Sequence, residues 1–380
     1  MSSSQNPLKP HFSLTFELLF NGYGWLCYDR GRDKDKGCYF RTMGPLNIEI
    51  TNPVPWKPDL SYAELYCPDF DFADVAAGLP EVEAIIDALH HRSGDISAQE
   101  FYHAGVNVYV KGGIENSAAN TLLGKKIATL VFLLEESLLL KLVAPSRWPR
   151  QFKPVSKESR AARCPAPQCD VVSFEYASHV PRTAAMEPAA KNNRDPELMY
   201  RKLAMVWSAP SLQELEHILA TRCDSDCNFF LVVHKEPVNM CTTPRRVEGK
   251  PEPKRVWFRF RYLQMTFDHA LLRNWVEIIA RIIELALAGP DEYKRCLEAI
   301  FRIQHETGRG GVAWEQLMKH VLNLEHRIPD WRDQLARYER GEVIAGLSED
   351  GLLARRMGPF YSQPSSFYNN CGYDPDPFIF

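Results

Sequence analysis

The chain lacks any apolar run long enough to cross a lipid bilayer. Its longest apolar stretch, around residues 127–142, is interrupted by Glu135, Glu136 and Lys141, whereas a membrane-spanning helix needs about 20 consecutive apolar residues. The first residues, Met-Ser-Ser-Ser-Gln-Asn-Pro, have neither the basic start nor the apolar core of a secretion signal. These absences predict a cytoplasmic protein with no membrane partner.

The motifs of several large enzyme classes are also missing. There is no glycine-rich phosphate loop of the Walker or Rossmann type, and no Gly-x-Ser-x-Gly nucleophile turn. The ten cysteines are scattered along the chain, and the closest pairs, Cys164/Cys169 and Cys223/Cys227, lack a second pair of Cys or His at zinc spacing. Free thiols are therefore expected, as in a reducing compartment.

A strong charge of one sign is absent too. The 380 residues carry a net charge of −3, with 45% hydrophobic and 24% charged residues. That composition is typical of a globular protein with one large or two smaller domains. The near-neutral balance argues against nucleic acid or an acidic membrane as the main partner.

Four segments alternate apolar and polar residues with the two-residue period of a strand. They are residues 12–20, 46–51, 105–111 and 256–262. Helical periodicity appears between and after them, at residues 81–92, 120–143, 211–222, 268–288, 291–305, 312–324 and 330–339. These patterns predict an α+β fold, in which a curved, mainly antiparallel sheet packs helices on its apolar face and presents a concave polar face.

One domain is expected over residues 12–350, after a flexible N-terminus of residues 1–11. Residues 145–195 are rich in Pro, Ala, Ser and basic groups, and residues 234–255 include a charged run. Both are expected to be mobile loops, and we expect one of them to cover the site as a lid; surface loops without a role are the alternative. The Pro- and aromatic-rich tail, residues 351–380, could fold back onto the domain.

The polar sides of the four strands would gather chemically useful groups. If the strands share one sheet, its polar face collects Thr15, Glu17, Asn47, Glu49, Asn107, Tyr109, Arg259 and Arg261. Carboxylates suit Mg²⁺ and guanidinium groups match phosphate, so this face could hold a magnesium–phosphate group. The alternative is that the two glutamates neutralise the two arginines across strands. The residue pattern leaves both interpretations open.

In this order, these segments resemble the fungal branch of the amidoligase family, which is similar to glutamine synthetase and γ-glutamylcysteine synthetase. The family's opening strand, Phe-Gly-x-Glu-x-Glu, corresponds to residues 12–17, and its Glu-hydrophobic-Ser-Pro strand to residues 49–53. Its Gly-Leu-His-Val-His-Val strand corresponds to residues 105–110, and its long helix ending in Pro-x-Arg to residues 122–147. The Glu-Phe-Arg-x-His-x-x-Thr-Leu-Asp strand and its Trp-bearing helix correspond to residues 259–276. The likeness covers about residues 12–289.

The resemblance implies a glutamine synthetase-like catalytic fold and an ATP-dependent carboxylate–amine ligase. Such an enzyme phosphorylates a carboxylate, and an amine then displaces phosphate to form an amide. The resemblance implies ATP and Mg²⁺ as cofactors, and a small-molecule or peptide carboxylate and an amine as substrates. The implied metal ligands are Glu17, Glu49 and Asn107. Arg261 and Arg147 would bind the nucleotide, and Arg261, Arg259 and Tyr109 would take the catalytic positions.

Several positions depart from the family pattern. Thr15 replaces the first glutamate of the opening strand, Asn107 and Tyr109 replace two histidines, and Arg259 replaces a glutamate. Each lost carboxylate removes a charge that helps to hold Mg²⁺, and Arg259 places a cation where the family has an anion. Two functions follow: a working ligase with an altered metal site, or a catalytically degenerate protein that uses the same fold as a binding or regulatory module.

Overall fold

The structure is a computed structural model. It describes residues 9–21, 39–42, 60–91, 96–98, 102–110, 118–145, 153–165, 174–181, 196–221, 229–233, 256–307, 312–344, 347 and 353. Within these residues, no helix combines the length and the apolar character that are needed to cross a membrane.

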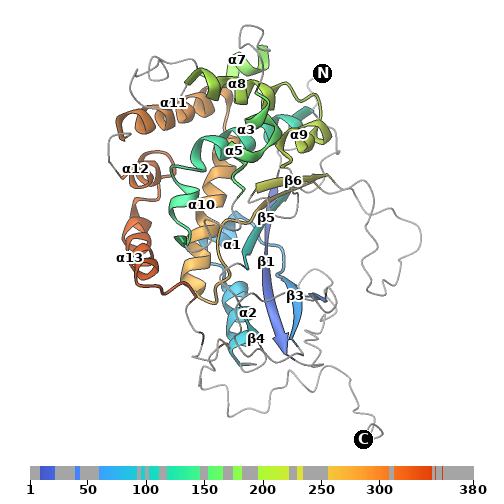
Figure 1. Cartoon of the computed structure of the whole chain (residues 1–380), viewed down its shortest axis with the longest axis vertical. Coiled ribbons are helices and arrows are strands. Elements are labelled where there is room, and N and C mark those ends of the chain that lie inside the picture. Colours follow the sequence, from blue (N-terminus) through green and yellow to red (C-terminus); the bar gives the residue numbers. More distant parts are fainter. Residues whose placement is uncertain are drawn as a thin grey trace, which may run out of the picture.

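One antiparallel sheet organises the described residues (Figure 1). Its order is β2-β3-β1-β5-β7-β6, and β4 adds to β1. The strands are β1 (Pro10–Asn21), β2 (Tyr39–Thr42), β3 (Leu60–Tyr66), β4 (Ile96–Ser97), β5 (Ala104–Val110), β6 (Phe229–Val233) and β7 (Val256–Phe260). The predicted α+β class and the mainly antiparallel pairing are thus confirmed.

The helices lie largely to one side of the sheet in Figure 1, with α10 between the sheet and the outer helices α11, α12 and α13. The α-helices are α1 (Phe72–Ala76), α2 (Pro80–His91), α3 (Ala118–Leu134), α5 (Val155–Glu158), α6 (Arg160–Arg163), α7 (Phe174–His179), α8 (Pro196–Trp207), α9 (Leu212–Leu219), α10 (His269–Leu287), α11 (Pro290–Thr307), α12 (Ala313–His320) and α13 (Ile328–Glu339). Short 3₁₀ turns cover η1 (Leu139–Lys141) and η5 (Glu325–Arg327).

The apolar side of the sheet forms the core with α3, α9 and α10. Along β1, Phe12, Leu14, Phe16 and Leu18 are all completely buried. A side chain at Gly124 of α3 would meet Leu215 of α9 at 2.9 Å and Phe258 of β7 at 3.5 Å. Glycine therefore lets α3 pack closely between a neighbouring helix and the sheet.

Helix boundaries follow local chemistry that the sequence already displays. Ser211 accepts a hydrogen bond from the Glu214 amide and so caps α9. Asp268 accepts bonds from the amides of Ala270 and Leu271 and so caps α10. At the other end of α10, the ammonium group of Lys126 donates to the carbonyls of Ala286 and Ala288. A cation there complements the negative end of the helix dipole.

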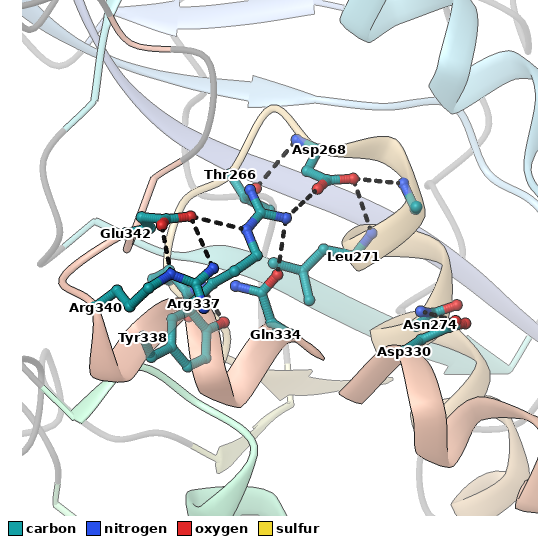
Figure 2. A network of polar contacts seen from close by, with 12 residues as sticks. Thr266, Asp268, Leu271, Asn274, Asp330, Gln334, Arg337, Tyr338, Arg340 and Glu342 are labelled. Carbon is teal, nitrogen blue, oxygen red and sulfur yellow. Dashed lines mark hydrogen bonds and ion pairs between the residues drawn. The ribbon is translucent and has the colours of Figure 1, made fainter. Parts of the chain in front are cut away.

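Helix α13 holds the segment that runs from β7 into α10. Figure 2 shows Arg337 of α13 between Asp268, the cap of α10, and Glu342. The nearest nitrogen–oxygen distances are 3.4 Å to Asp268 and 3.5 Å to Glu342. The buried amide of Gln264 also donates to the hydroxyl of Tyr338. The segment after β7 is thus fixed at two points by one helix.

Some sequence expectations were wrong, and others fall on residues outside the description. Residues 145–195 were expected to be a loop, but their described parts include α5, α6 and α7. The predicted strand 46–51 and the loop 234–255 lie outside the described residues. Of the tail, residues 351–380, the structure describes Leu353, which is buried and donates its amide to the carbonyl of Ile96.

Candidate functional site

The polar sides of β1, β5 and β7 meet in cross-strand rows. Ser13 of β1 lies opposite Asn107 of β5, and Asn107 lies opposite Arg259 of β7. Residues that face each other in an antiparallel ladder project from the same side of the sheet. Glu17, four residues after Ser13, projects from that side as well. Of the predicted site residues, Glu17, Asn107 and Arg259 therefore share one sheet face.

This face is buried along β1 and β5 instead of being solvated. Thr15 is completely buried, and Ser13 and Asn107 are each 4% exposed. The Asn107 amide nitrogen donates to the Thr15 hydroxyl at 2.7 Å and lies 3.4 Å from the Ser13 hydroxyl. These bonds fix the Asn107 side chain so that its amide nitrogen points along β1.

Glu17 pairs with His103, the residue before β5. Its Oε2 atom lies 2.7 Å from Nδ1 of His103 and accepts the backbone amide of the same residue at 3.2 Å. Both side chains are buried, with 12% and 7% of their areas exposed. A carboxylate can only accept, so Nδ1 of His103 carries the proton and Nε2 presents a lone pair.

The surroundings of His103 keep its imidazole neutral. Burial lowers its pKa to about 3. The charge of Glu17 and its hydrogen bond act in the opposite direction, whereas the charges of Arg261 and Arg259 lower the pKa further. Burial and the charge of Glu17 also raise the pKa of the neighbouring Tyr102. The site at neutral pH thus combines one carboxylate, one neutral imidazole and two guanidinium groups.

Gly105 lies beside both the imidazole of His103 and the guanidinium group of Arg259. A Cβ at Gly105 would lie 3.6 Å from Nε2 of His103 and 3.6 Å from Nε of Arg259. It would also lie only 3.3 Å from Cδ2 of the imidazole. Both nitrogens therefore lie near the Cβ position of residue 105, and a side chain there would crowd the imidazole.

Arg261 lies just beyond β7, which ends at Phe260. Val106 pairs with Phe260, and the next bridge joins His103 to Gln264. Between these two pairs the chain advances three residues on the β5 side (103 to 106) but four residues on the β7 side (260 to 264). One extra residue makes a β-bulge, a feature that commonly redirects side chains at the end of a ladder. Arg261 is half-buried there, and its charge still acts on His103.

Tyr109 lies in an aromatic row on the same face. It is opposite His11 of β1 and Trp257 of β7. Its ring centroid is 5.6 Å from that of His11 and 4.9 Å from that of Trp257, and the residue is completely buried. The row closes one end of the face, two residues along β5 from Asn107.

The described residues supply only part of the predicted metal and nucleotide site. Glu49 and Arg147 lie outside the described residues. Within the description, no three acidic, His or Cys side chains gather as a metal site would require. Glu17 supplies one carboxylate that is already bonded to His103, and Asn107 supplies one amide oxygen. This donor set alone does not complete the oxygen shell of Mg²⁺.

His103 is the site residue that the alternating pattern did not identify. The pattern places the start of the strand at Gly105, so His103 falls just outside it. Extending the two-residue period by one step would have put His103 on the face that carries Gly105 and Asn107. Comparisons with family models, with curated proteins and with solved structures found no significant match.

Proposed function

We propose that this protein is an amidoligase-like, ATP-dependent ligase that joins a carboxylate to an amine. In this reaction the carboxylate oxygen takes the γ-phosphoryl group of ATP, and ADP leaves. The amine nitrogen then attacks the acyl carbon, phosphate leaves with the C–O bond electrons, and the nitrogen loses a proton. The proposal rests on the resemblance of the strand motifs and on the arrangement of the residues that they place.

The observation that carries the proposal is the shared face of β1, β5 and β7. Glu17, Asn107 and Arg259 come from three segments that are far apart in sequence, yet their strands are adjacent and their side chains project from one side. Such an arrangement is what a glutamine synthetase-like catalytic sheet requires. Arg259 and Arg261 would stabilise the negative charge of a phosphate or an acyl phosphate.

Magnesium would neutralise charge on the phosphate groups of ATP. Among the described residues, Glu17 and Asn107 have the oxygens that could contribute to holding it, and further ligands would have to come from elsewhere, Glu49 first. Tyr109 and Arg147 are the remaining site residues that the resemblance implies. The substrates would be a small or peptide carboxylate and an amine, with neither nucleic acid nor a membrane as partner.

Calorimetry with ATP and Mg²⁺, followed by a phosphate-release assay with pooled amino acids, tests the proposal. Arg261→Ala should weaken ATP binding tenfold or more, because a charge-assisted contact contributes roughly 1.5–3 kcal/mol. Arg281→Ala is the matched control, because Arg281 is a partly exposed arginine that pairs with Glu284 of the same helix, α10. Absence of ATP binding at millimolar concentration would rule out the ligase.

A second function, an anion-binding or regulatory module without ligase activity, is favoured by one specific contact. The carboxylate of Glu17 is bonded to His103, and a cation, Arg259, occupies the family's glutamate position. Arg259→Glu separates the two functions, because it restores the family charge. The ligase should then bind Mg²⁺ more tightly, whereas the binding module should lose its anion and gain no Mg²⁺ affinity.

A further inference from the structure

We propose that Nε2 of His103 is a specificity-determining acceptor that selects small carboxylates with a hydroxyl or amine donor on the adjacent carbon. The carboxylate of such a ligand would bind Arg259, and its O–H or N–H group would donate to His103. This inference deepens the proposed function, and it rests on the anion site described there.

The first step is the tautomer of His103. Glu17 accepts from both Nδ1 and the backbone amide of His103, so the proton is held on the Glu17 side. The lone pair on Nε2 then has a defined direction, away from Glu17. An imidazole fixed in this way can accept a hydrogen bond but cannot donate one from Nε2.

The second step is the unmet hydrogen-bonding capacity of Nε2. His103 is 6% exposed, and Nε2 is a buried atom without a hydrogen-bond partner in the structure. Buried polar atoms in folded proteins are nearly always bonded, so an exception of this kind is often explained by a ligand or a water molecule. The neighbouring groups determine which ligand chemistry fits.

The third step is the position of Arg259. Nε2 of His103 and Nε of Arg259 are each 3.6 Å from the Cβ position of Gly105, so the two atoms are at most 7.2 Å apart. Two hydrogen bonds of about 2.9 Å each would take up most of that distance. The hydrogen-bond donor and the carboxylate of the ligand must therefore lie close together in one small molecule, and not at the distant ends of a long one. A guanidinium has five N–H donors, so Arg259 can bind an anion in addition to its other contacts.

Acetate and glycolate are the matched probes, because they share one carboxylate and differ by one hydroxyl. The full-length protein should bind glycolate roughly three- to tenfold more tightly than acetate, as expected for one net hydrogen bond. His103→Asn keeps an amide that can donate to Glu17 but removes the acceptor at Nε2. In this variant the preference for glycolate over acetate should vanish. Gly105→Ala should weaken glycolate binding most, because the added methyl group would crowd the imidazole and lie close to both nitrogens.

Failure of this inference can be distinguished from failure of the anion site on which it rests. If the wild-type protein binds neither acetate nor glycolate, the anion site itself is wrong, and this inference fails with it. If acetate binds but glycolate is not preferred, or if His103→Asn keeps the preference, the inference fails and the anion site stands. Should His103→Asn not fold, nitrogen-15 NMR of the wild-type imidazole replaces it. The Nε2 resonance should then shift with glycolate and not with acetate, and equal shifts would overturn the inference.

Discussion

Glu17 and His103 are 86 positions apart in sequence, yet one oxygen of the glutamate accepts both the backbone N–H and the Nδ1–H of the histidine. The pair joins β1 to the residues that precede β5, because the backbone amide of Glu17 also donates to the carbonyl of His103. Three hydrogen bonds thus join the same two residues of the polar face. The contribution of this pair to the free energy of unfolding can be measured directly.

Two replacements of Glu17 should therefore destabilise the protein to different extents. Glu17→Ala leaves two buried donors without an acceptor, which should lower the free energy of unfolding by about 2–4 kcal/mol. Glu17→Gln keeps a neutral acceptor, so about 1 kcal/mol should be lost. Urea unfolding measures both. Glu83→Ala is the control, because Glu83 is 60% exposed and lies 3.9 Å from His269. Equal losses in all three variants would contradict the role of the pair.

The pH dependence of stability should reveal the buried imidazole. The pKa of His103 is about 3 in the folded protein and about 6.5 when unfolded. Between these values the unfolded chain binds a proton that the folded protein does not bind, so stability rises with pH. As the pH falls from about 6.5 towards 3, His103 should remove up to about 1.4 kcal/mol per pH unit.

His103→Asn provides the comparison for that titration. Its unfolding free energy should depend less steeply on pH between about 4 and 6, because no imidazole is present at position 103. The same series in His326→Asn should match the wild type, because His326 is mostly exposed beside Glu277. A slope in His103→Asn as steep as that of the wild type would show that other groups dominate the acid response.

The sequence predicted those parts of the sheet in which one face is apolar and the other polar. β1, β5 and β7 alternate cleanly because one side of each strand packs in the apolar core and the other side carries the polar residues. β6 reads Phe-Phe-Leu-Val-Val and β3 reads Leu-Ser-Tyr-Ala-Glu-Leu-Tyr. Neither has the two-residue alternation, so both were missed. Helices were easier to predict where a cap marked the start, as at Ser211 and Asp268.

The candidate site was only partly predictable for a related reason. Alternation correctly placed Glu17, Asn107 and Arg259 on one face, but it cannot show which strands are neighbours. Nor could it show the bulge after Phe260, because an extra residue changes the pairing without a local sequence signal. The alternation also could not show that this polar face is buried at β1 and β5, where Thr15 and Asn107 are covered. Burial of polar residues depends on segments that pack from elsewhere in the chain.

Glu135 should be as important for the helical layer as Glu17 is for the sheet. Its completely buried carboxylate accepts from the amides of Val155 and Ser156 and from the hydroxyl of Tyr262. Burial raises its pKa, and these bonds only partly oppose that effect. Glu135→Gln replaces one acceptor oxygen by a donor, so at least one N–H or O–H would face another donor.

We expect Glu135→Gln to lower the free energy of unfolding by about 2–3 kcal/mol, and Tyr262→Phe by about 1 kcal/mol. Denaturant unfolding of both single variants and of the double variant measures the coupling. The double variant should lose less than the sum, because the two changes remove one shared bond. Strict additivity would mean that Tyr262 and Glu135 do not stabilise each other.

Asp268 combines two contacts that substitution can separate. It caps α10 through the amides of Ala270 and Leu271, and it lies 3.4 Å from Arg337 of α13 (Figure 2). The ion pair is partly exposed, with side chains 31% and 26% accessible, so solvent weakens it. The helix cap should therefore contribute more to stability than the attraction between Asp268 and Arg337.

Asp268→Ala removes both contacts and should lower the free energy of unfolding by about 1–2 kcal/mol, whereas Asp268→Asn keeps a good cap and should cost about 0.5 kcal/mol or less. Arg337→Ala should also have a small effect, since Arg337 shares its charge between Asp268 and Glu342. Thermal and urea unfolding of the three variants decide between the contacts. If Asp268→Asn costs as much as Asp268→Ala, the attraction between Asp268 and Arg337 holds α10 in place, and the helix cap is secondary.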